Sequence, residues 1–170
     1  MHDILAVYDS ANGYVTGHAR FTPTATDSLP IPPDTPANPN QPSAQVVVGF
    51  TNLMAGSSTT PSTGSFDLRY VVKNNHDEVD LSSTSVTWLV VPDSTHAKVL
   101  GYANLIVYEP GTVAQYKNVA VRFDISLGDV GHPGHVIIRI YEPAMNPNTG
   151  TPTWIMDDDL ATNSNVMIRP

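Results

Sequence analysis

The 170-residue chain contains no cysteine, and only 14% of its residues are charged. The absence of cysteine excludes disulfides, thiol catalysis and cysteine-ligated zinc. Eight Lys and Arg stand against sixteen Asp and Glu, so the chain lacks the basic patch that nucleic acid or an anionic membrane would require. No apolar run approaches the ~18 residues of a membrane helix. The composition predicts one soluble, acidic domain that spans residues 1–170 and needs no crosslink to hold its core.

Residues that favour strands dominate the chain. Val occurs 19 times and Thr 17 times, whereas Lys, Glu and Gln are scarce, and this balance favours β-structure over helix. The turn signals recur at the ~8 to 12 residue spacing of an all-β domain. The sequence therefore predicts an antiparallel two-sheet β-sandwich, jelly-roll or Ig-like, of about nine or ten short strands. The predicted strands are residues 4–9, 14–22, 44–53, 66–72, 86–91, 99–109, 119–127 and 136–142, with weaker ones at 154–156 and 166–168.

Alternation of apolar and polar residues locates the core. It is cleanest at Val119 to Leu127, where every second residue is apolar. The run 86–91 is apolar except for Thr87, which is typical of a central strand buried on both faces. The residues predicted to form the core are Phe66, Leu68, Tyr70, Val72, Trp88, Leu89, Val90, Val119, Val121, Phe123, Ile125, Val136, Ile138 and Ile140.

Residues 23–43 hold seven prolines, which cannot donate hydrogen bonds to a β-ladder. This segment is predicted to be a long loop. Because loops of this length are often functional, and proline limits the entropy lost on binding, a partner is expected to touch it.

The histidines do not form a recognisable catalytic motif. His132 and His135 lie three residues apart, which would allow both to bind one metal, but two solvated loop histidines are the simpler interpretation. The chain also lacks the Gly-x-Ser-x-Gly elbow of serine hydrolases. No enzyme activity is predicted.

No cofactor is predicted, and bound calcium is the alternative. Asp157, Asp158 and Asp159 are adjacent carboxylates, with Asn163 and Asn165 close by, and hard oxygen ligands of this kind suit calcium. Two other acidic segments, 74–80 and 9–12, are weaker candidates. None has the spacing of an EF-hand, and a solvated acidic loop is the simpler interpretation of each.

A sugar site is the other candidate. Trp154 follows a loop-rich stretch that includes Asn146 and Asn148. A flat ring beside amide groups is suited to bind a carbohydrate. These three residues are the predicted ligand-binding set.

Several short motifs follow one another in a fixed order along the chain. They are Val7-Tyr8-Asp9, Gly13-Tyr14-Val15-Thr16-Gly17, Trp88-Leu89-Val90-Val91, Ile138-Arg139-Ile140-Tyr141-Glu142 and Ile155-Met156-Asp157-Asp158. With these motifs in this order, the sequence resembles the post-COAP-1 domain, a module at the C-termini of large secreted bacterial proteins that carry PKD, HYR or Ig-like repeats. The resemblance implies a secreted, non-enzymatic β-domain.

Three functions remain open. The first is a non-enzymatic structural or adhesive module at the cell surface, whose partners are extracellular matrix, a cell-surface glycan or another surface protein. The second is a carbohydrate-binding module that uses Trp154. The third is a filament or sheath subunit in which residues 4–9 complete a neighbour's sheet by strand addition. None of the three involves nucleic acid or membrane insertion.

Overall fold

The computed structural model describes residues 13–24, 27–28, 45–57, 59–71, 78–109, 112–128, 134–161 and 164–170. All regular elements in these ranges are strands. They are β1 (Tyr14–Phe21), β2 (Gln45–Met54), β3 (Thr63–Val71), β4 (Glu78–Val90), β5 (His96–Glu109), β6 (Thr112–Ser126), β7 (His135–Tyr141), β8 (Trp154–Asp159) and β9 (Met167–Arg169). No helix in this part of the chain is long and apolar enough to cross a membrane.

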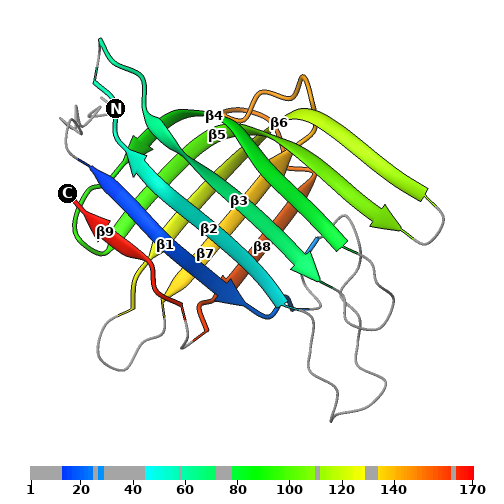
Figure 1. Cartoon of the computed structure of the whole chain (residues 1–170), viewed down its shortest axis with the longest axis horizontal. Coiled ribbons are helices and arrows are strands. Elements are labelled where there is room, and N and C mark those ends of the chain that lie inside the picture. The colour runs from blue at the N-terminus through cyan, green and yellow to red at the C-terminus, as the bar shows by residue number, and fades with distance from the viewer. Residues whose placement is uncertain are drawn as a thin grey trace, which may run out of the picture.

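The nine strands form one continuous antiparallel sheet in the order β8-β7-β6-β5-β4-β3-β2-β1-β9 (Figure 1). The predicted all-β, antiparallel class is confirmed. The structure has one curled sheet, a half-barrel, where two stacked sheets were expected. The reason is connectivity: from β1 to β8 each strand pairs with the next strand in the chain, whereas jelly-roll and Ig-like sandwiches need connections that cross between sheets.

Aromatic contacts show how tightly the sheet curls. Phe123 on β6 meets Phe50 on β2 edge to face, with ring centroids 5.4 Å apart, although three strands separate β6 from β2 in the sheet. Phe66 on β3 also contacts Phe123, at 5.0 Å. Such contacts require the inner face of the sheet to fold back on itself. The curl therefore buries the apolar face that a second sheet would otherwise have to cover.

The two ends of the curled sheet are joined by short segments outside the strands. Ser28, which follows β1 in the chain, exchanges two backbone hydrogen bonds with Ile155 on β8, of 2.9 and 3.0 Å. In the other direction, the chain after β8 reaches β1, where the backbone N–H of Asn165 donates to the His18 carbonyl at 2.9 Å. These pairings occupy backbone groups that a sheet edge would otherwise leave open.

Most of the predicted core is confirmed. The predicted residues that are buried are Phe66, Leu68, Tyr70, Leu89, Val119, Val121, Phe123, Ile125, Val136, Ile138 and Ile140. Val72 lies outside the described residues, as do the predicted strand 4–9 and most of the proline-rich segment.

Trp88 and Val90 are exceptions, because both are only half-buried. The register between β4 and β5 shifts by one residue between Val86 and Trp88. A shift of one residue in a strand exchanges the two faces, so Leu89 points into the core and Trp88 points outward. The prediction that Trp88 belongs to the core is wrong for this reason.

Gly101 on β5 allows the central strands to pack closely. A Cβ atom built at this position would lie 2.5 Å from the ring of Phe66 and would also clash with the carbonyl oxygen of Ser85. We expect Gly101→Ala to lower the free energy of unfolding by about 1–3 kcal/mol, as overpacking in a core does. Urea denaturation measures the change. Ala103→Gly, two residues along the same strand, is the matched control, because it removes atoms and adds none.

Candidate functional site

The predicted calcium ligands are divided between the two faces of a strand. Asp157, Asp158 and Asp159 lie on β8 rather than on a loop, so their side chains alternate. Asp158 is 5% exposed and faces inward, whereas Asp157 and Asp159 are exposed on the outer face. Among the residues that the structure describes, no group of three or more His, Asp or Glu side chains is placed to hold a metal ion.

The two outward carboxylates share a histidine. His135 on β7 hydrogen-bonds Asp159 Oδ1 through Nδ1 at 3.2 Å and Asp157 Oδ1 through Nε2. Burial acts to lower the pKa of the His135 imidazole, but the hydrogen bonds to Asp159 and Asp157 outweigh it and raise that pKa above 6.5. His135 therefore occupies carboxylate oxygens that were expected to bind a cation, and in its protonated form it offsets part of their charge. His132 lies outside the described residues.

Asp158 forms a carboxyl pair with Asp27. Burial is the main cause that raises the pKa of Asp158 to about 7, and the hydrogen bond with Asp27 adds to it. Asp27 also accepts the backbone N–H of Asp157 at 3.1 Å, so it ties the segment after β1 to β8. One oxygen of Asp158, Oδ2, is buried without a hydrogen-bond partner.

Trp154, the predicted sugar-stacking ring, packs against the core. It is half-buried, and its ring meets Tyr116 of β6 edge to face at a centroid distance of 5.4 Å. It does not line the groove that holds Asn146 and Asn148. The structure thus separates the predicted tryptophan from the two predicted amides.

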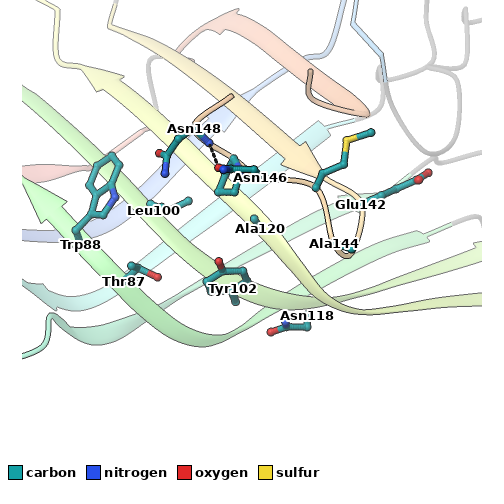
Figure 2. A pocket seen from close by; sticks show the side chains of 12 residues that line it. Thr87, Trp88, Leu100, Tyr102, Asn118, Ala120, Glu142, Ala144, Asn146 and Asn148 are labelled. Atoms are coloured by element: carbon teal, nitrogen blue, oxygen red, sulfur yellow. Dashed lines mark hydrogen bonds between the residues drawn. The ribbon is translucent and has the colours of Figure 1, made fainter. Parts of the chain in front are cut away.

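A groove of about 550 Å³ lies on the outer face of the sheet, between β4, β5, β6 and the loop 142–150. Leu100 and Ala120 form its buried floor. The half-buried rings of Trp88 and Tyr102 stand at its side (Figure 2). The bulge that removes Trp88 from the core is therefore what places its ring in this groove.

Polar side chains form the rim of the groove. Asn146 and Asn148 extend from the loop 142–150, Asn118 lies in the middle of β6, and Glu142 directly follows β7. All four are exposed. The Asn148 backbone N–H donates to Asn146 Oδ1 at 2.9 Å, which orients the Asn146 amide (Figure 2).

Arg122 on β6 connects the loop 142–150 to the sheet through a hydrogen bond. Its Nη1 donates to the carbonyl oxygen of Pro147 at 3.2 Å, and its guanidinium lies 5.7 Å from the centre of the Trp88 ring. Pro147 is buried, whereas its neighbours Asn146 and Asn148 are exposed. Arg122 thus holds both the aromatic wall and the polar rim in place.

Comparisons with known proteins assign no family: no family model, curated protein or solved structure matches the chain significantly. The resemblance to the post-COAP-1 domain stays a prediction.

Sequence reasoning found two of the groove residues and missed the aromatic pair. Asn146 and Asn148 were identified because they lie in a turn-rich loop before a tryptophan. Trp88 was missed because the segment 86–91 was expected to be buried on both faces. Tyr102 was missed because a tyrosine at a strand position is ordinary at the margin of a sheet. No signal in the sequence marks the bulge that turns Trp88 outward.

Proposed function

We propose that this chain is an extracellular contact domain that binds carbohydrate in its outer groove. The observation that carries the proposal is the placement of the Trp88 and Tyr102 rings beside the amides of Asn118, Asn146 and Asn148 in one groove. Carbohydrate binding is also one way in which a cell-surface module adheres, so the proposal joins two of the functions that the sequence left open.

The chemistry of the groove favours a sugar over other ligands. An aromatic ring packs against the C–H face of a pyranose, and an amide offers both donors and acceptors to hydroxyl groups. A purely apolar ligand would leave the three amides unpaired at a cost in free energy. Glu142 is the charged residue on the rim, so neutral sugars are favoured over acidic ones.

Replacing Trp88 by alanine tests this function. We expect Trp88→Ala to weaken binding of neutral oligosaccharides on the order of 30-fold, the loss typical of an aromatic hot spot of about 2 kcal/mol. The ligands are first selected on a glycan array with the unmodified protein, and their affinities are then measured by isothermal titration calorimetry.

Tyr108→Ala is the matched control, because Tyr108 is a half-buried aromatic residue on β5 that does not line the groove. Its affinity for the same oligosaccharides should equal that of the unmodified protein. An array without any bound glycan, or equal binding by the Trp88 variant, contradicts the proposal.

Secretion, a calcium requirement and self-association stay predictions. Strand addition through residues 4–9 concerns a segment outside the described residues.

A further inference from the structure

A second cluster of polar side chains lies on the same outer face of the sheet, where β5 begins. The turn between β4 and β5 contains Asp93, and β5 begins at His96. In the antiparallel ladder His96 pairs with Ser126, the last residue of β6. Strand pairing thus places a serine beside a histidine that is 30 residues away in the chain.

The three side chains are connected in a defined order. Both carboxylate oxygens of Asp93 lie 2.9 Å from His96 Nδ1. On the other side of the ring, His96 Nε2 lies 3.3 Å from Ser126 Oγ. When Nδ1–H donates to Asp93, Nε2 is left as the acceptor for the Ser126 hydroxyl proton. This is the order of roles in which an acid, a base and a nucleophile form a catalytic triad.

The turn holds Asp93 rigidly. Its Oδ1 also accepts the backbone N–H groups of Thr95 and His96, at 2.7 and 2.8 Å, and the Thr95 hydroxyl at 2.7 Å. The hydrogen bond from the Thr95 side chain, followed by that from His96, holds the pKa of Asp93 well below its usual range. The carboxylate therefore stays ionised near neutral pH and orients the imidazole.

A hollow of about 130 Å³ adjoins the serine. His96, Ser126, Lys98 and Ile137 are among the residues that line it. The side chain of Ile137 offers an apolar contact, and the Lys98 ammonium, 3.8 Å from Asp124 Oδ1, offers a positive charge. A short acyl group matches the small size of the hollow, and Lys98 is suited to stabilise negative charge on a carbonyl oxygen.

We propose that Ser126, His96 and Asp93 form a nucleophilic triad that hydrolyses esters of short acyl groups. Ser126 Oγ attacks the carbonyl carbon while its proton passes to His96 Nε2. The tetrahedral intermediate collapses, the C–O bond to the leaving alcohol breaks, and that alcohol takes the proton from Nε2. Water then attacks the acyl-serine with His96 as base, which releases the carboxylic acid and restores the Ser126 hydroxyl. Asp93 is the positioning residue.

This proposal is independent of the sugar groove, which shares none of these residues. It opposes the prediction that the chain has no enzyme activity. That prediction depended on the histidines being isolated in the sequence, and the pairing of β5 with β6 brings His96 into hydrogen-bond reach of a serine.

Covalent labelling of the full chain with a fluorophosphonate probe tests the proposal, because the probe reacts with activated serines. We expect a single adduct on Ser126 by peptide mass spectrometry. The adduct should be absent in Ser126→Ala, and the labelling rate should fall by about 100-fold in His96→Ala. Asp93→Asn should lower kcat for p-nitrophenyl acetate with little change in KM, and Asp93→Glu should restore part of it.

Ser85→Ala and His18→Ala are the matched controls, since both residues are exposed and lie on β4 and β1 outside the cluster. Both should label like the unmodified protein, and circular dichroism should show that each variant is folded. Absence of an adduct on Ser126, or labelling of folded His96→Ala at the unmodified rate, would overturn the triad.

Discussion

Replacing Phe123 by alanine is expected to lower the free energy of unfolding by about 3–5 kcal/mol. The Phe123 ring is 1% exposed and contacts the rings of Phe50 and Phe66, so its removal leaves a cavity where the curled sheet meets itself. The surrounding strands are hydrogen-bonded on both sides and have little freedom to close that cavity. Denaturation with guanidinium chloride, followed by circular dichroism, gives the value.

Val113→Ala is the control for this effect. Val113 is 57% exposed near the start of β6, so its truncation should change the free energy of unfolding by less than about 0.5 kcal/mol. If Phe123→Ala cost no more than the control, the inner face of the sheet would not close around Phe123 as described.

Replacing Asp158 by asparagine is expected to remove a pH-dependent loss of stability. The pKa of Asp158 is about 7 in the folded protein and 3.8 in an ordinary environment, so between these pH values the folded state binds more protons than the unfolded state. The stability that protonated Asp158 contributes is fully present below about pH 3.8. It is lost as the pH rises towards 7, by on the order of 2–4 kcal/mol.

The charged groups around Asp158 act in both directions. Asp27 and Asp157 raise its pKa, and His135 lowers it.

Asparagine at position 158 keeps the shape and a hydrogen bond to Asp27 but cannot ionise. The stability of Asp158→Asn relative to the unmodified protein should therefore increase from pH 4.5 to pH 8 in urea denaturation. Asp67→Asn, at an exposed position on β3, is the control and should show no such trend. A difference independent of pH for Asp158→Asn would mean that the carboxyl is already ionised at low pH.

The alternating segments were predicted well because one periodicity describes both the chain and the sheet. At Phe66, Leu68 and Tyr70, and again from Val119 to Ile125, every second residue is buried. The polar stretches were predicted less well. Residues 78–85 and 112–118 were not expected to be strands, but they pair with their neighbours for most of their length. Such polar segments become strands because an adjacent strand supplies hydrogen bonds, and their own propensity does not reveal it.

The candidate sites also divide into features that follow from a local pattern and features that depend on strand pairing. Asn146 and Asn148 were found from their turn context, because a turn is a local property of a few residues. The contribution of Trp88 to the groove depends on a bulge in the pairing of β4 with β5, and the Ser126–His96 contact depends on the register of β5 with β6. Neither register is a property of one segment, so sequence reasoning about separate segments does not reach it.

The sequence by itself determined the class of the protein: an acidic, cysteine-free, antiparallel all-β chain whose core residues alternate along its strands. Composition and periodicity suffice for this because they act through each residue's own hydrophobicity and backbone preference. The tertiary structure decided that the sheet is single and curled, that Trp88 faces outward, and that Asp158 is buried beside Asp27. These features depend on which strands pair, in what register and around what curvature. They arise from contacts between residues far apart in the chain, which no local pattern encodes.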